Sequence, residues 1–407
     1  MKRLSLAALL ESRLARTVAV VLWGVSVVAL ALQTLHKAHR RHGNDFTMYL
    51  NAAGALLDGR NPYTLGGTLP YMYPLFLAAV LAPLTAVPPD LATLAWFLLS
   101  VASLVVAARV TGDLAREARI VEPGAPLTVP TVALWFLLFD PIQNNLLNGQ
   151  VNFQIVLLCM LYLKLGLRGR TTASAASLAA AIAVKLTPAL CLGFMAARRR
   201  WAAIALCFGL SAFFVLAPVV LPGAEGGRAY LAYAALVLLP RVHTEFPTAH
   251  RGVRFSVNGV LEALVPGWDG VVWRRALGVS VPLAGLVLVE LLARRRGARG
   301  RDVWIFSLYL LAQLLVSPLS EVHHLAYAFP AAGLLALGAL PGGSAPRTGL
   351  RSAGLAAAWL LLAGGRVNRD GPWFFLALCL VGGLAAAQAL SRPAAAGPRS
   401  CGRVGAR

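Results

Sequence analysis

An aspartate just past the first long apolar run is the strongest candidate for acid–base chemistry in this sequence. Asp45 follows the run at about residues 16–35, and residues 46–57 after it form a short amphipathic stretch. Such a stretch is expected to lie at a membrane interface. A carboxylate held at that boundary could accept a proton from a sugar hydroxyl, if partial burial tunes its pKa. The alternative is that Asp45 only caps the helix that starts there, because aspartate is a favoured capping residue.

Amide side chains gather in a second polar segment, residues 140–152, with the sequence DPIQNNLLNGQVN, of which residues 140–149 are expected to form an outer loop. Amides suit sugar hydroxyls because each one offers both donors and acceptors. An ordinary turn is the alternative, since asparagine, glycine and proline favour turns. A turn does not, however, require Gln150 and Asn152 at the start of the next apolar run. Asn145, Gln150 and Asn152 are therefore candidates for binding a sugar or an acceptor.

A lysine and a histidine pair could bind phosphate. Lys185 is the only charged residue in the apolar segment 172–197. A charge at membrane depth costs roughly a few kcal/mol, so it usually has a functional partner, and a lipid-linked phosphate would suit it. The alternative is that Lys185 reaches the membrane surface by snorkelling. His323 and His324, which follow Glu321, could bind phosphate, shuttle a proton or ligate a metal, although a metal would need two further ligands.

The composition indicates which class of protein must position these residues. Hydrophobic residues make up 58% of the 407 residues and charged residues only 13%, and the mean hydropathy is +0.70. This pattern, spread over many apolar runs, is typical of an integral membrane protein. The net charge of +21 could indicate nucleic acid binding, but the basic residues are mostly arginines in short clusters between apolar runs. We therefore expect membrane lipids and no nucleic acid as partners. The five cysteines are scattered without a CxxC pair, so they support neither a disulfide framework nor a zinc site.

The arginine clusters predict the topology, because cytoplasmic loops are enriched in basic residues. The N-terminus is expected inside and residues 36–70 outside, and the clusters at 198–200 and 294–296 are expected inside. The result is an all-α bundle of about 11–13 transmembrane or re-entrant helices. It forms one domain, residues 1–391, followed by a basic cytoplasmic tail, residues 392–407, that is expected to be disordered.

Two segments complicate this topology. The stretches 71–87 and 91–108 cannot both cross the membrane if Arg109 is inside, so one is expected to be a re-entrant dip, unless the charge rule fails there. Segment 172–197 begins and ends at basic clusters and is interrupted by Lys185-Leu186-Thr187-Pro188, which indicates a broken helical hairpin. Near an inner helix end, Glu290 is expected to form a local ion pair with Arg294.

The same topology gathers carboxylates, amides and histidines on the extracytoplasmic side, opposite the arginine clusters. Snorkelling and the charge rule explain the arginines but not this gathering. Arg254 lies in the longest outer loop, residues 222–275, where its guanidinium fork could match phosphate oxygens. The alternative for Arg254 is a solvated basic loop.

Several short motifs, taken in order, resemble those of glycosyltransferase family 87. They are Asp45-Phe46 with Tyr49, Ala53 and Gly59-Arg60-Asn61-Pro62-Tyr63, then Tyr73-Pro74, Gly149-Gln150-Val151-Asn152, Lys185-Leu186-Thr187-Pro188 followed by Arg198-Arg199-Arg200-Trp201, and Ser317-Pro318 through His323-His324. Each motif alone is weak, but the ordered set over roughly residues 45–330 is fairly specific. The chain departs from the family pattern at Leu75 and at Asn148.

The resemblance implies a GT-C type membrane fold and a polyprenyl-phosphate sugar donor, typically carrying mannose. It implies inverting transfer to a lipid or glycan hydroxyl on the outer face, with Asp45 as the base and with no cofactor or metal. The expected donor-phosphate ligands are Lys185, Arg254, His323 and His324. The expected sugar or acceptor ligands are Tyr49, Tyr63, Asn145, Gln150, Asn152 and Glu321.

Two other classes of protein fit part of the sequence. A transporter or lipid flippase would explain a broken helix and an intramembrane lysine. Its usual internal repeat is missing, and the polar residues gather on one face rather than at the midplane. A non-catalytic assembly factor would not explain the outer carboxylates and amides. The glycosyltransferase interpretation is therefore favoured.

Overall fold

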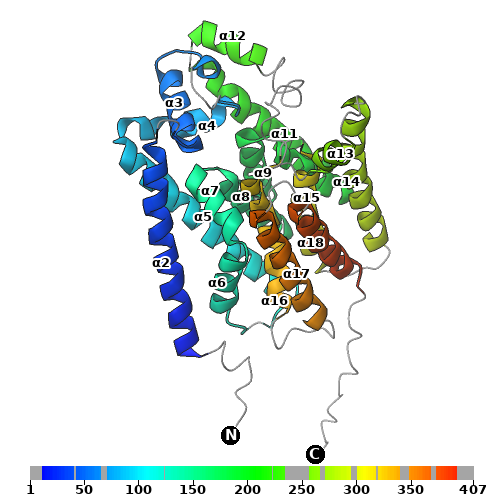
Figure 1. Ribbon diagram of the computed structural model, residues 1–407. Coiled ribbons are helices and arrows are strands. Elements are labelled where there is room, and N and C mark those ends of the chain that lie inside the picture. The colour runs from blue at the N-terminus through cyan, green and yellow to red at the C-terminus, as the bar shows by residue number, and fades with distance from the viewer. Residues whose placement is uncertain are drawn as a thin grey trace, which may run out of the picture.

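The computed structural model describes residues 12–40, 43–65, 71–122, 124–221, 223–233, 256–265, 271–294, 300–317, 320–339, 348–367 and 373–391. All regular structure in these ranges is helical (Figure 1). The helices long and apolar enough to cross a membrane are α2 (Arg13–Ala38), α5 (Pro89–Glu117), Trp201–Val220, Trp273–Arg294 and α18 (Trp373–Leu390). Shorter apolar helices lie between them. The protein is an all-α polytopic membrane protein, as predicted; the tail 392–407 lies outside the described residues.

At one end of the bundle, α2 leads into α3 (Asp45–Leu57), followed by α4 (Leu75–Leu81) and η2 (Ala82–Ala86). Figure 1 shows α3 and α4 near the top, above the end of α2. The end of α2 meets the start of α5, where His39 pairs with Asp90 at 2.9 Å. From there α5 runs for 29 residues, whereas α4 and η2 pack on α3. Of the two stretches that sequence alone did not separate, 91–108 lies in a helix long and apolar enough to cross a membrane, whereas Leu75–Ala86 is a shorter apolar helix.

The chain bends sharply at Gly149, between two helices in its middle part. After α6 (Thr128–Leu137), residues 140–149 belong mostly to helix α7 (Phe139–Asn148) and do not form the predicted loop. Gly149 ends α7 in a left-handed conformation, and α8 (Asn152–Leu167) leaves at 114° to it. The loop prediction was wrong because the apolar positions of this segment lie on one face of a short helix, which buries Ile142 and Leu146.

The predicted broken hairpin is present. Helix α9 (Thr171–Val184) ends at Lys185, whose backbone is extended, and η3 (Thr187–Cys191) and α10 (Leu192–Ala197) follow. Pro188 cannot donate a hydrogen bond to continue α9, so a break here is expected. Arg200 donates to the Gly166 carbonyl at 3.0 Å near the end of α8, so the hairpin returns to the end of the bundle where it began.

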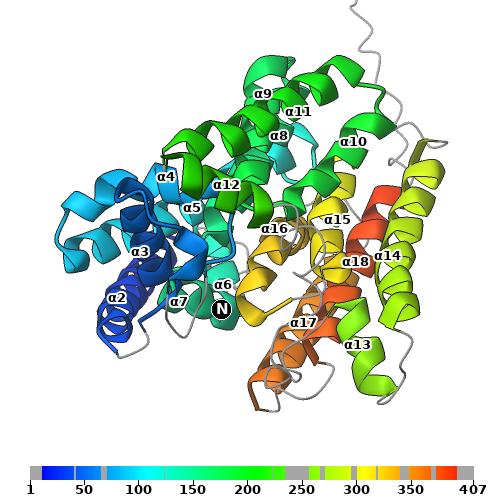
Figure 2. The same cartoon turned by 90° about the horizontal axis from the view of Figure 1, so that it is seen from above.

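The second half of the chain encloses α15. It comprises α11 (Trp201–Leu216), η4 (Ala217–Val220), α12 (Gly223–Tyr233), α13 (Val257–Leu264), α14 (Val271–Arg294), α15 (Arg301–Val316), η7 (Val322–Ala328), α16 (Phe329–Gly338), α17 (Thr348–Val367) and α18. Nearly every residue of α15 is buried. Figure 2 shows this helix between α16 and α18, with α2 and α3 at the opposite edge from α14.

At the far end of the bundle from α3, basic residues pair with acidic ones. Arg198 binds Glu290 at 2.9 Å and Asp302 at 2.6 Å, and Lys164 binds Asp113 at 2.5 Å. The predicted pair between Glu290 and Arg294 was wrong. The hairpin brings Arg198 to the buried Glu290, while Arg294 donates to the Ala197 carbonyl.

Candidate active site

Asp45 is the first residue of α3 and is not its cap. The cap is Asn44, whose Oδ1 accepts from the Thr47 N–H at 3.1 Å, while the Asn44 N–H donates to Thr47 Oγ1 at 3.4 Å. The alternative interpretation of Asp45 as a capping residue is therefore wrong. Its carboxylate is available for other contacts at a helix start, where the helix dipole favours a negative charge.

The partner of Asp45 is Gln150, from the turn between α7 and α8. Gln150 Nε2 donates to Asp45 Oδ2. On the other side of the same amide, Oε1 accepts from the hydroxyl of Tyr49 at 3.2 Å and from that of Tyr73 at 3.2 Å. Gln150 and Tyr49 are buried. The carboxylate is therefore held through a buried polar network that joins α3, the segment before α4, and the α7–α8 turn.

The turn that carries Gln150 requires a glycine. Gly149 has φ +63°, and a Cβ there would lie 2.6 Å from the Cβ of Phe46. Its carbonyl accepts from Trp96 Nε1 at 2.7 Å, and the Trp96 ring stacks on Phe46. Because only glycine combines this conformation with this close approach, the turn packs directly against the first turn of α3.

A second network holds η7 beside the same turn. The side-chain Nδ2 atoms of Asn145 and Asn152 both donate to the His323 carbonyl, at 3.2 and 3.3 Å. Lys185 Nζ lies 3.5 Å from Asn152 Oδ1 and 2.7 Å from His324 Nε2. The break after α9 thus places Lys185 beside the histidine pair. The side-chain amides of Asn145 in α7 and Asn152 in α8 hold the backbone of that pair at the His323 carbonyl.

Glu321 sets the orientation of both histidines. Its backbone N–H donates to His324 Nδ1 at 2.9 Å, and its Oε2 lies 3.5 Å from His323 Nδ1. With Nδ1 of His324 occupied as an acceptor, the ring meets Lys185 through Nε2, at 2.7 Å from Nζ. The lysine and the imidazole are therefore in direct contact, and together they offer an anion a basic group beside a polar ring.

Comparison with known proteins identifies the family. Residues 71–318 match the sequence model of glycosyltransferase family 87. The chain belongs to glycosyltransferase family 87. The matched range includes Tyr73, Gln150, Asn152 and Lys185. The protein is therefore a membrane glycosyltransferase, as its motifs predicted.

Two mycobacterial enzymes are similar over most of their length. The chain is 27% identical over 354 residues, 84% of this chain and 76% of the relative, to a polyprenol-phosphate-mannose-dependent alpha-(1-2)-phosphatidylinositol pentamannoside mannosyltransferase of Mycobacterium tuberculosis strain CDC 1551. It is 28% identical over 376 residues, 87% of this chain and 82% of the relative, to a polyprenol-phosphate-mannose-dependent alpha-(1-2)-phosphatidylinositol mannoside mannosyltransferase of strain H37Rv. No solved structure matches the chain.

In this glycosyltransferase the pKa of Asp45 is raised to about 6, mainly because the carboxyl group is buried. The negative charge of Glu321 raises it further, whereas the hydrogen bond from Gln150 and the positive charges of Lys37 and Lys185 lower it. A carboxyl group with this pKa is mostly ionised at neutral pH and is still basic enough to accept a proton.

Most of the residues predicted for the site converge in the structure. They are Asp45, Tyr49, Asn145, Gln150, Asn152, Lys185, Glu321, His323 and His324. Tyr63 lies one step away, with its hydroxyl on the Tyr73 carbonyl at 2.9 Å and its ring stacked on Tyr230. Arg254 lies outside the described residues. Within those residues, no group of three or more His, Cys, Asp or Glu side chains is placed to hold a metal ion.

Two residues of the site were not singled out from the sequence. Tyr73 was noted only as part of a motif, yet its hydroxyl binds Gln150. Lys37, near the end of α2, donates to Asn148 Oδ1, and its charge acts on Asp45. The short sequence distance between Lys37 and Asp45, both at the C-terminal end of the first apolar run, was the signal that could have indicated this lysine.

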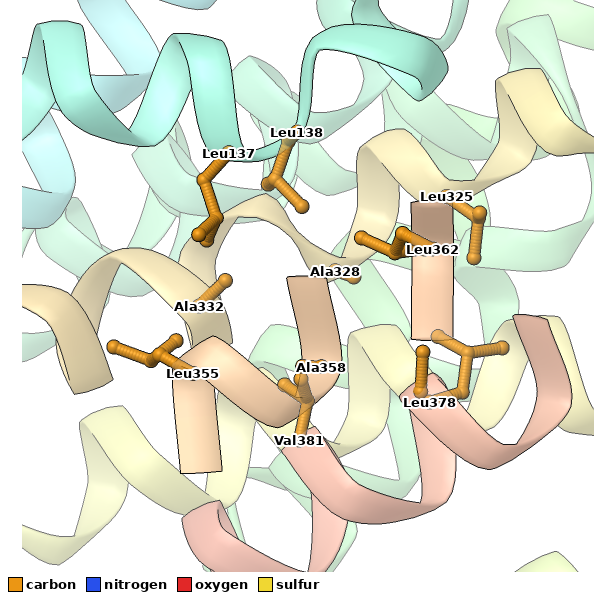
Figure 3. A pocket seen from close by; sticks show the side chains of 11 residues that line it. Leu137, Leu138, Leu325, Ala328, Ala332, Leu355, Ala358, Leu362, Leu378 and Val381 are labelled. Carbon is orange, nitrogen blue, oxygen red and sulfur yellow. The ribbon is translucent and has the colours of Figure 1, made fainter. Parts of the chain in front are cut away.

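An apolar pocket lies beside η7, as Figure 3 shows. Its lining comes from the α6–α7 junction, η7, α16, α17 and α18. The lining residues include Leu137, Leu138, Leu325, Ala358, Leu362 and Leu378. Leu325 directly follows His324 in the chain, so the pocket adjoins the segment that carries the histidine pair. Apolar walls next to a lysine and a histidine pair suit a phosphate ester of a long hydrocarbon chain.

Proposed function

We propose that this glycosyltransferase moves a mannosyl group from polyprenyl-phosphate mannose to a hydroxyl of a lipid or glycan acceptor, with inversion and with Asp45 as the general base. The observation that carries the proposal is the convergence of one carboxylate of raised pKa with a lysine–histidine pair. The names of the two mycobacterial relatives support the donor and suggest a phosphatidylinositol-type glycolipid as the acceptor.

The chemistry requires one base and one site for the leaving group. Asp45 accepts the proton of the acceptor hydroxyl as its oxygen attacks the anomeric carbon of the donor sugar. The bond from that carbon to the phosphate oxygen breaks, and the phosphate departs on the opposite face with the bonding electrons. Lys185, held beside the imidazole of His324, then stabilises the additional negative charge on the polyprenyl phosphate.

The donor lipid is proposed to lie along the apolar pocket beside η7. With the phosphate at Lys185 and His324, the first isoprene units would reach Leu325 and then Leu362 and Leu378. Burial of each apolar unit favours binding in proportion to the area removed from water. A lipid donor also explains why the site is built at a membrane boundary.

The active site is proposed to face the extracytoplasmic side, with residues 1–391 forming one catalytic unit. Supporting this, Asp45 and α3 occupy one end of the bundle, and the start of α2, with Arg13 and Arg16, lies at the other (Figure 1). The Arg198 and Lys164 ion pairs lie at that other end too. Basic segments tend to face the cytoplasm in membrane proteins, which supports an outside position for the end with Asp45.

A transfer assay tests the donor. The protein, purified into lipid nanodiscs, is given radiolabelled polyprenyl-phosphate mannose or radiolabelled nucleotide-diphosphate mannose, together with phosphatidylinositol mannosides. We expect label in the glycolipid fraction only with the polyprenyl donor, because the proposed site joins Lys185 and His324 to an apolar pocket that would hold a lipid chain. Equal transfer from the nucleotide sugar, or none from either donor, would contradict the proposal.

A further inference from the structure

Gln150 is placed to orient Asp45 rather than to contact a sugar. Its Nε2 donates to Asp45 Oδ2, and its Oε1 accepts from the hydroxyls of Tyr49 and Tyr73, each at 3.2 Å. Both ends of the amide are thus occupied within the protein. Among the described residues, no hydrogen bond is seen to Oδ1 of Asp45, which leaves that oxygen to receive a proton.

We propose that Gln150 is a positioning residue whose amide is set by Tyr49 and Tyr73, so that Asp45 presents Oδ1 to the acceptor hydroxyl. This rests on the proposed role of Asp45 as the base. An ionised carboxylate accepts hydrogen bonds but cannot donate them, so it requires the Nε2 end of the amide. The opposite orientation would place Oε1 against Oδ2 and leave Nε2 to the two hydroxyls.

Burial makes the orientation of Gln150 costly to change. Gln150 is 5% exposed and Tyr49 is fully buried. A buried polar atom without a partner costs free energy, so the amide cannot rotate without losing its contacts. The Gly149 turn and the Trp96 bond to its carbonyl also hold the backbone of the amide against α3. A single tyrosine hydroxyl is enough to occupy Oε1, and the two together act as redundant donors.

The charged groups around Asp45 set the sign of the expected pH effect. They are Glu321 from η7, Lys37 from α2 and Lys185 from the break after α9. Gln150 stabilises the ionised form of Asp45, so its loss raises the pKa. Because the base must be ionised, kcat/KM falls as the pH drops through this pKa, and a higher pKa moves the fall to higher pH.

The test is the pH dependence of kcat/KM for mannosyl transfer in nanodiscs. For the wild-type protein we expect the acid limb near the Asp45 pKa of about 6. Gln150→Ala should move it up by about one pH unit and lower the plateau about tenfold, with the donor KM unchanged. Tyr49→Phe and Tyr73→Phe should each change the acid limb and the plateau only slightly. The double variant should change both by more than the sum of the two single effects.

The controls separate positioning from loss of structure and from loss of the base. Gln154→Ala removes a second amide, four residues after Gln150, whose Nε2 donates to Ser100 Oγ at 2.9 Å. This variant should keep the acid limb of the wild-type pH profile. The phenylalanine variants retain the aromatic rings, and gel filtration is used to check that they fold. An unshifted limb in Gln150→Ala, or a higher acceptor KM with no shift, would overturn the positioning role. Full activity of Asp45→Asn would instead overturn the proposed function itself.

Discussion

Replacing Asp45 with asparagine is expected to lower kcat for mannosyl transfer about 10³-fold, within the range found for removal of a general base. Asparagine keeps the size and hydrogen-bonding capacity of the side chain but cannot take up a proton. The donor KM should change little, because the proposed donor-phosphate site is at Lys185 and His324 and not at Asp45. The measurement is single-turnover transfer of radiolabelled mannose in nanodiscs, with equal amounts of folded protein.

The matched control for this variant is Asp58→Asn. Asp58 follows the same helix, is exposed, and pairs with Arg60 at 2.7 Å. A surface ion pair of this kind contributes little to stability, so transfer should stay within about twofold of wild type. If Asp45→Asn retained wild-type kcat, the base would have to be another group.

Lys185→Met is expected to lower kcat/KM about 10²- to 10³-fold, as for removal of one electrostatic contact to a developing charge. Methionine keeps the length of the side chain and removes the ammonium group. The product polyprenyl phosphate should also become a weaker inhibitor, because it has lost a charged partner. Initial rates at several concentrations of added polyprenyl phosphate measure both effects.

Arg168→Met serves as the matched control for the lysine. Arg168 pairs with Glu117 at 2.6 Å at the end of the bundle away from Asp45, and its side chain is half exposed. Rate and product inhibition should remain those of the wild-type protein. Unchanged inhibition by polyprenyl phosphate in Lys185→Met would remove this lysine from the leaving-group site.

The sequence predicted those parts of the fold that depend on local chemistry. Apolar length predicted a polytopic helical protein, and Lys185 with Pro188 predicted the break after α9. The predictions that were wrong or left open concerned features that depend on contacts between distant segments of the chain. Nothing local distinguishes α7 from a loop until its apolar face is packed, and Glu290 finds Arg198 only because the hairpin brings α10 to α14.

The candidate site shows the same division. The type and spacing of residues singled out Asp45, Gln150 and the histidine pair, but not which atoms meet. Gln150 reaches Asp45 across 105 residues of sequence and Tyr73 across 77. Such pairings are set by the way α3 packs on the Gly149 turn, and a single sequence carries no direct record of that packing.

The most direct test of the central claim is a structure of the Asp45→Asn variant in nanodiscs with polyprenyl-phosphate mannose bound. We predict the donor phosphate against Lys185 Nζ and His324 Nε2, the anomeric carbon facing residue 45, and the first isoprene units beside Leu325 in the apolar pocket. A donor phosphate bound elsewhere, for example at Arg198 at the opposite end of the bundle, would contradict the account.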